Sequence, residues 1–244
     1  MTENAPMQPV HLVLLPGMDG TEVLLLPLLR NLPDWLRPTV VTYAIEGRNG
    51  YDDLLPKVLL AIDALPECVV LGWSFSGPLA LRAANQRRDR VRAVILCATF
   101  ARAPQAWMRP WRALLQTPIV GTMRFLRRLP LWLGRPPDDP LRRDKAILWR
   151  RVPARTLAAR ARAIAAVDAR EDLRRCVQPI LYLAASDDAV VPPANLDEVR
   201  REQPTVQVAT IVGNHFALYA NPEAATQAIV TFVRDNNAPP PNDH

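Results

Sequence analysis

Short, almost continuous apolar runs recur along the chain, separated by segments in which the apolar residues have helical spacing. Apolar runs of this kind are typical of strands buried on both faces of a parallel sheet. They predict strands at 10–15, 39–44, 92–98, 179–184 and 206–212, and a further strand that begins at Cys68. Helices are predicted at 22–32, 51–65, 77–89, 194–203 and 222–235. Six strands in alternation with helices predict an α/β fold with a doubly wound, essentially parallel six-stranded sheet.

The alternation stops after the fourth predicted strand. Residues from about 100 to 172 indicate several helices broken by prolines, which predicts a helical lid inserted into the core. The core is then formed by 1–99 and 173–237, and the proline-rich segment 238–244 is predicted to be a disordered tail. Ligands of such sheets bind beyond the carboxyl ends of the strands, so the lid is expected to cover that edge.

Length and composition indicate one globular unit in a reducing compartment. The 244 residues are enough for a sizeable core, and no apolar run approaches the roughly 18 residues of a membrane helix. Residues 1–9 lack the basic and then apolar pattern of a secretory signal. The three cysteines are far apart, with Cys68 and Cys97 at or in predicted strands, so no disulfide or metal site is indicated. These features predict a cytoplasmic protein.

Ser74 is the first candidate for chemistry. It lies in Gly72-Trp73-Ser74-Phe75-Ser76-Gly77, between a predicted strand and a predicted helix. This arrangement is close to a nucleophile elbow, in which small neighbours allow the backbone to turn sharply beside the serine. Ser76 stands where that motif has its second glycine. The helix N-terminus beneath Ser74 favours negative charge that develops there.

A serine nucleophile needs a base, and the chain offers three histidines. His11 opens a predicted strand and His244 ends the tail, whereas His215 lies in a loop at the end of a predicted strand. The loop after strand 179–184 offers two carboxylates, Asp187 and Asp188, of which one orients the histidine in a Ser-His-Asp triad. The alternative for such a pair is turn formation, which aspartate favours.

Two backbone N–H groups are candidates for an oxyanion hole. One belongs to Phe75, the residue after Ser74, and the other to Met18 in the loop Leu15-Pro16-Gly17-Met18-Asp19-Gly20. Taken alone, that loop favours a simple turn between a strand and a helix over an oxyanion loop.

Four stretches resemble the α/β-hydrolase superfamily in order and spacing, and the whole is most similar to small bacterial carboxylesterase-like members. They are 14–21, 72–77, 188–192 and 213–223. The resemblance implies an α/β-hydrolase fold trimmed to six parallel strands, with a triad in the chain order serine, aspartate, histidine. It favours Asp188 over Asp187, because the family's acid commonly begins a D-x-x-V-P segment and Asp188-Ala189-Val190-Val191-Pro192 fits that pattern.

The chemistry most consistent with these residues is hydrolysis of an ester or thioester through an acyl-enzyme on Ser74. A serine nucleophile argues against the dehalogenase and epoxide hydrolase branches of the superfamily, which use an aspartate. The sequence contains neither a cluster of metal ligands nor a glycine-rich dinucleotide loop, so no metal and no cofactor is expected.

The predicted lid is the expected source of specificity. Four of the six tryptophans lie in it, and Trp107 and Trp111 are expected to contact the substrate together with Trp73 of the elbow. Residues 102–175 also contain seventeen arginines and one lysine against six acidic residues, in a chain of net charge +6.

Three interpretations of this basic lid remain open. It packs on the core with solvated arginines outside, it forms an acyl pocket whose rim attracts an acidic carrier or substrate, or its helices touch an anionic membrane surface. The tripeptide Gly72-Trp73-Ser74 resembles the elbow of esterases that act on carrier-linked esters. Nucleic acid is not expected as a partner, because no recognised binding motif accompanies the charge.

A different class of function is a ligand receptor or signalling protein built on the same fold, since fold does not determine function. An intact Ser-His-Asp set favours turnover. A binding protein would show saturable ligand binding without formation of an acyl-enzyme.

Overall fold

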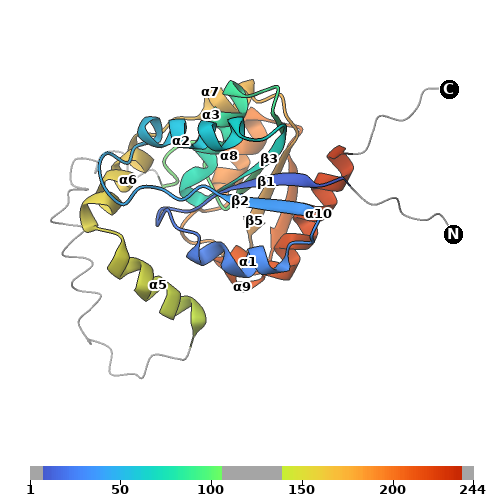
Figure 1. Cartoon of the computed structure of the whole chain (residues 1–244). Coiled ribbons are helices and arrows are strands. Elements are labelled where there is room, and N and C mark those ends of the chain that lie inside the picture. Colours follow the sequence, from blue (N-terminus) through green and yellow to red (C-terminus); the bar gives the residue numbers. More distant parts are fainter. Residues whose placement is uncertain (1–7, 106–138, 238–244) are drawn as a thin grey trace, which may run out of the picture.

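The computed structural model describes residues 8–105 and 139–237, and its centre is a six-stranded, all-parallel sheet (Figure 1). The strands follow one another in space in the order β2-β1-β3-β4-β5-β6. Their bounds are β1 Val10–Leu15, β2 Leu36–Val40, β3 Cys68–Trp73, β4 Val91–Cys97, β5 Ile180–Ala185 and β6 Gln207–Ile211. The order reverses direction beside β1 and β3, which is where a doubly wound sheet places its ligand crevice.

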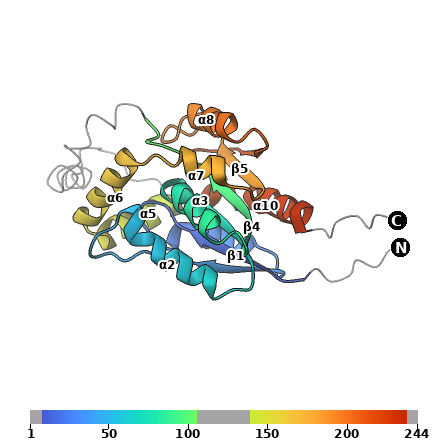
Figure 2. The same ribbon diagram turned by 90° about the horizontal axis from the view of Figure 1, so that it is seen from above.

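Helices cover both faces of the sheet, as a parallel sheet requires (Figures 1 and 2). One face is covered by α2 Tyr51–Asp63, α3 Gly77–Gln86, α7 Arg170–Arg175 and α8 Ala194–Glu202. The other face is covered by α1 Leu26–Asn31, α9 Ala217–Ala220 and α10 Pro222–Asn237. Two short 3-10 turns, η1 Val23–Leu25 and η2 Ser74–Ser76, precede α1 and α3.

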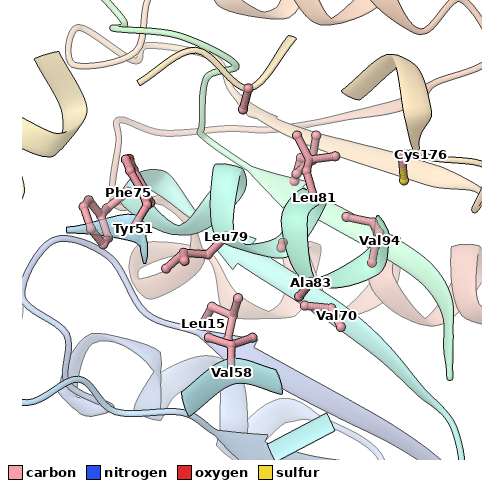
Figure 3. Packing of buried hydrophobic residues seen from close by; sticks show 14 of the residues in the cluster. Leu15, Tyr51, Val58, Val70, Phe75, Leu79, Leu81, Ala83, Val94 and Cys176 are labelled. Carbon is pink, nitrogen blue, oxygen red and sulfur yellow. The ribbon is translucent and has the colours of Figure 1, made fainter. Parts of the chain in front are cut away.

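The apolar run of β1 is buried because its residues alternate between two cores. Leu12 and Leu14 belong to the cluster packed against α1 and α10, whereas Val13 and Leu15 belong to the cluster packed against α2 and α3. Figure 3 shows part of the second cluster, in which Leu15 lies near side chains of α2 and α3. Two covered faces explain why the central strand β3 is buried along its whole length and contains no charged residue.

Two helices, α5 Pro140–Arg151 and α6 Ala154–Ala166, lie between β4 and β5 in the chain and beyond the carboxyl ends of the strands (Figures 1 and 2). The two ends of the segment that contains them meet: the Ala169 N–H donates to the Ala101 carbonyl at 2.6 Å, and Arg102 forms an isolated bridge with Asp168. The segment therefore leaves and rejoins the sheet at one place. Much of the predicted lid, 106–138, and the tail 238–244 lie outside the described residues.

The predicted elements agree with the structure except at some boundaries. The second strand is Leu36–Val40 rather than 39–44, because β2 pairs with β1 from Leu36 onward and the apolar residues Val41 and Tyr43 are buried after the ladder has ended. The first predicted helix, 22–32, is divided into the 3-10 turn η1 and the helix α1, which begins at Leu26. Pro27 fits the first turn of a helix and not its interior. No helix within 8–105 or 139–237 is long and apolar enough to span a bilayer.

Candidate active site

The elbow, residues 72–77, is formed by the end of β3, the turn η2 and the start of α3. Ser74 has φ of +52°, in the left-handed region that non-glycine residues avoid. A side chain held in this conformation at the end of a strand projects away from the sheet, as in a strained strand-to-helix turn. The Thr99 hydroxyl donates to the Ser74 carbonyl and supports the turn from the end of β4.

The strained turn depends on close packing at Gly72. A Cβ at this position would lie 2.6 Å from the Ser76 carbonyl oxygen and 2.9 Å from the Ala80 Cβ. Gly77 has as little room, because a Cβ there would meet the Thr99 side chain. Gly72 is therefore required by contact with Ser76 and the first turn of α3, and Gly77 by contact with the segment that follows β4.

His215 and Asp188 lie beside Ser74. The Ser74 Oγ is 2.8 Å from the His215 Nε2, and the His215 Nδ1 is 2.8 Å from an oxygen of Asp188. Since an ionised carboxylate can only accept, Nδ1 carries the proton and Nε2 accepts from the serine hydroxyl. The His215 and Asp188 side chains are 9% and 4% exposed, so the pair is held away from bulk water.

The loop after β5 fixes Asp188 and leaves Asp187 in a different environment. The Asp188 Oδ1 accepts from the N–H groups of Val190 and Val191, both at 2.8 Å, which leaves Oδ2 for His215. Asp187 is exposed and accepts from the Ser186 hydroxyl. The structure thus brings Asp188, and not its neighbour, together with His215 and Ser74.

The loop after β1 forms a tight turn, residues 16–20, beside the elbow. The Gly20 N–H donates to the Gly17 carbonyl at 3.0 Å. In a planar trans peptide the N–H points opposite to the carbonyl, so the Met18 N–H is directed away from the inside of this turn. Met18 and Ser74 line the same cavity. The Phe75 ring stacks on Tyr51 in the core, as Figure 3 shows, and the Phe75 backbone stays next to Ser74.

A cavity of about 520 Å³ lies in front of Ser74. The turn, the elbow and His215 form one side of it, and side chains of α5 and α6 form the other. Most of the described lining is apolar: Leu24, Trp73, Phe100, Leu148, Val152, Leu157, Ala161, Ile164, Val190 and Phe216. Its volume and apolar lining suit an acyl chain or another small organic group.

Trp73 lines this cavity and is 2% exposed, and its indole N–H is buried without a partner in the part of the chain that is described. The other two tryptophans expected to contact substrate, Trp107 and Trp111, lie outside the described residues. Lys145 of α5 also lines the cavity, and its ammonium lies 4.1 Å from the centre of the Phe216 ring. Within 8–105 and 139–237 no cluster of His, Cys, Asp or Glu is placed to hold a metal ion.

Two polar groups near the turn escaped the sequence analysis. The buried Ser76 hydroxyl donates to the Pro16 carbonyl and lies 2.5 Å from the Tyr43 hydroxyl. Arg160 of α6 is fully buried and reaches the Met18 carbonyl. The sequence did contain one signal for Arg160. Residues 156, 160 and 164 lie on one face of α6, and the other two residues of this set are buried.

Comparison with known proteins identifies the family to which the chain belongs. A sequence model of the alpha/beta hydrolase family matches residues 8–228, which is most of the chain. The chain belongs to this family. Solved structures agree on the fold: an enol-lactonase from Burkholderia xenovorans superposes with a TM-score of 0.74 at 20% identity, over 95% of this chain and 94% of that one. A bromoperoxidase from Bacillus anthracis gives a TM-score of 0.77 at 16% identity, over 93% of both chains.

Curated relatives add the esterase character. The chain is 25% identical to a pimeloyl-[acyl-carrier protein] methyl ester esterase of Nitrosospira multiformis, over 79% of this chain and 78% of that protein. It is 27% identical to the biotin biosynthesis bifunctional protein BioHC of Cellvibrio japonicus, over 92% of this chain but only 42% of that protein. The chain thus spans less than half of the bifunctional relative. It is an esterase-like alpha/beta hydrolase, as the sequence predicted.

Proposed function

We propose that this alpha/beta hydrolase cleaves carboxylic esters or thioesters through an acyl-enzyme on Ser74. The observation that carries the proposal is the continuous hydrogen-bonded chain Ser74–His215–Asp188 at one wall of an apolar cavity. A serine hydroxyl is a weak nucleophile at neutral pH and becomes effective when an adjacent base takes its proton. His215 is in hydrogen-bonding distance for this role, and Asp188 holds the required tautomer.

In the first half of the reaction the Ser74 Oγ attacks the ester carbonyl carbon while His215 Nε2 takes its proton. The tetrahedral intermediate collapses when the carbon–oxygen bond to the leaving group breaks, and His215 returns the proton to the departing alcohol or thiol. In the second half a water molecule attacks the acyl-enzyme, again losing a proton to His215. The carboxylic acid leaves, and the proton goes back to Ser74.

The charge that develops on the carbonyl oxygen needs donors that are in place before the reaction. The N–H groups of Phe75 and Met18 are the proposed donors, because one follows the nucleophile and the other faces out of the turn 16–20. Removal of one such donor typically lowers kcat about 10²- to 10³-fold.

The helices α5 and α6 are the proposed lid, and their apolar side chains in the cavity suit an acyl chain.

Intact-protein mass spectrometry after treatment with a fluorophosphonate tests the proposal on wild type and Ser74→Ala. A single phosphonyl adduct that is absent from the variant is expected, together with hydrolysis of p-nitrophenyl esters by wild type alone. The circular dichroism and melting temperature of Ser74→Ala serve as the control for folding. Absence of an adduct on folded wild type, with saturable ester binding, would instead favour the ligand-receptor interpretation.

A carrier-linked substrate is the second candidate, favoured by the name of one relative and by the arginine-rich segment 102–175. Arg142 and Arg151 of α5 are exposed and lie on the proposed lid. A lid of this charge suits an acidic carrier protein, because complementary charge can raise association rates by 10-fold or more. The carrier is then recognised by the lid and the acyl chain by the cavity.

Charge reversal separates this candidate from a free-ester esterase. The double variant Arg142→Glu with Arg151→Glu is expected to lower kcat/KM about 10-fold for a methyl ester on an acidic acyl-carrier protein, with little change for the free ester. The matched control is Arg200→Glu with Arg201→Glu on α8, where both arginines are also exposed. Equal effects of the two double variants would argue against docking on the lid.

A further inference from the structure

The turn 16–20 is held by donors from three different places. Three successive carbonyls each accept a hydrogen bond: Pro16 from the Ser76 hydroxyl, Gly17 from the Gly20 N–H, and Met18 from the Arg160 guanidinium at 2.8 Å. Ser76 belongs to the elbow and Gly20 to the turn itself, whereas Arg160 comes from α6, between β4 and β5. Each of the three peptide planes around Met18 therefore has a partner that fixes its orientation.

Arg160 is costly to bury, and its guanidinium donates four hydrogen bonds. The residue is 0% exposed. Its other donors go to the Ala44 carbonyl at 3.0 Å and twice to the Asn49 side-chain oxygen at 3.2 and 2.7 Å. All of these partners are carbonyl or amide oxygens, so no carboxylate forms a direct ion pair with the guanidinium in the described residues. A buried charge of this kind is seldom more stabilising than a well-packed apolar residue. Its presence therefore calls for a role other than stability.

The chain makes room for this guanidinium at Gly20. A Cβ on Gly20 would lie 2.6 Å from Arg160 Nη1, and Gly20 has φ of +72°. Burial lowers the pKa of Arg160 to about 10, which leaves it charged at neutral pH. The turn and the arginine thus fit one another through both shape and hydrogen bonding.

We infer that Arg160 is a positioning residue: by fixing the Met18 carbonyl it holds the peptide plane next to the one that carries the Met18 N–H, and so keeps Met18 and the direction of its N–H in place. The inference rests on the proposed function, in which that N–H stabilises the oxyanion. It also links two parts of the site, because the same helix α6 presents Leu157, Ala161 and Ile164 to the cavity. The helix that contacts the substrate is then the helix that orients the oxyanion donor.

A positioning role predicts a specific kinetic signature for Arg160→Met. With p-nitrophenyl esters, kcat is expected to fall about 10- to 100-fold while KM changes little, since misplacement by about 1 Å costs up to about 100-fold. The inhibition constant of an alkyl boronic acid, whose tetrahedral adduct occupies the oxyanion site, is expected to rise by the same factor. The inhibition constant of the carboxylic acid product, a ground-state ligand, is expected to stay within about threefold.

The matched control is Arg155→Met, which removes the same charge from the same helix. Arg155 is exposed and pairs with Glu46 at 3.2 Å. Its kinetic constants are expected to stay within about twofold of wild type. Values for Arg160→Met that match this control would overturn the inference while leaving the proposed function intact, because wild-type hydrolysis and labelling of Ser74 test that function separately.

If Arg160→Met does not fold, Arg160→Lys decides the question with the same measurements. Lysine keeps the charge but lacks the fork that reaches Met18, Ala44 and Asn49 together. Parallel losses in kcat and in boronate affinity support the inference. Wild-type values for both, in a folded Arg160→Lys, overturn it.

Discussion

The elbow 72–77 and the turn 16–20 hold the two proposed oxyanion donors in different ways. The elbow is fixed largely by close packing, since a Cβ on Gly72 would collide with Ser76 and Ala80 and a Cβ on Gly77 with Thr99. The turn is fixed largely by hydrogen bonds from side chains far away in the chain. Ser76 is 60 residues from Pro16, and Arg160 is 142 residues from Met18.

The two halves of the site are therefore expected to respond to different changes, namely added volume in one and loss of a hydrogen-bond donor in the other. A segment held mainly by close packing is most sensitive to added volume. A segment held by distant polar groups tolerates added volume where there is space, but loses its geometry when one distant donor is removed. Substitutions that distinguish volume from hydrogen bonding therefore separate the two.

The largest effect is expected at a third segment, the loop after β5, where local hydrogen bonds fix Asp188. Asp188→Asn is expected to lower kcat about 10⁴-fold, because the amide no longer favours the tautomer in which Nε2 accepts from Ser74. Asp187→Asn is the matched control and is expected to lose less than about threefold, since Asp187 is exposed and bonded to Ser186. Steady-state kinetics on both variants checks this, and the reverse order would move the proposed role to Asp187.

Gly72→Ala and Gly17→Ala compare added volume in the elbow and in the turn. In the elbow a methyl group meets a backbone carbonyl at 2.6 Å, and the free energy of unfolding is expected to fall by about 1–3 kcal/mol. At Gly17 the nearest atom lies at 3.5 Å, so stability is expected to stay level or to rise by up to about 1 kcal/mol. Urea unfolding measures both, and a loss at Gly17 as large as at Gly72 would show that the turn is also closely packed.

Ser76→Ala tests hydrogen bonding without added volume. It leaves the buried Pro16 carbonyl without its donor and is expected to cost about 1–2 kcal/mol of stability. Tyr43→Phe removes the hydroxyl that donates to Ser76 but keeps the bond to Pro16, so a smaller loss of about 0.5–1 kcal/mol is expected. The same unfolding experiment ranks the two. Equal losses would indicate that the Tyr43 contact, and not the Pro16 contact, is what Ser76 contributes.

The comparison also explains how much could be predicted from the sequence. The fold and the places of Ser74 and His215 followed from local signals: apolar runs, a glycine-flanked serine, and the ends of strands. The choice of Asp188 over Asp187 came from the resemblance to the family and its D-x-x-V-P segment. The two polar contacts that fix the turn followed from neither. Ser76 stood in the sequence as a departure from a glycine motif, and only the structure reveals its bond to Pro16, 60 residues away.

Arg160 illustrates the same limit on the lid side. In a segment with seventeen arginines, one buried arginine is hidden by composition, and its partners Met18, Ala44 and Asn49 share no pattern with it. Sequence periodicity places Arg160 on the buried face of its helix, but it does not say which carbonyls that face meets. Contacts between segments depend on the tertiary arrangement, which local patterns do not encode.

The smallest expected effect concerns Asp19, which lines the cavity within the turn and accepts from the Thr21 N–H at 2.9 Å. Burial raises the pKa of Asp19, and hydrogen bonds from Thr21 and the charge of Arg160 oppose this only in part. The folded protein therefore keeps a proton on Asp19 at pH values where the unfolded chain, with an ordinary carboxyl pKa, has released it. The contribution of this carboxyl to stability is then greatest at acidic pH and falls as the pH rises through the raised pKa.

Urea midpoints of wild type and Asp19→Asn at pH 4, 5.5 and 7 isolate this contribution, because asparagine does not titrate. The stability of wild type relative to Asp19→Asn is expected to decrease as the pH rises. This decrease is expected if hydrogen bonds to its carbonyls hold the turn, and not an ion pair between Asp19 and Arg160. An increase with pH would mean that ionised Asp19 forms a stabilising pair with Arg160, and charge attraction rather than the Met18 carbonyl would then account for the buried guanidinium.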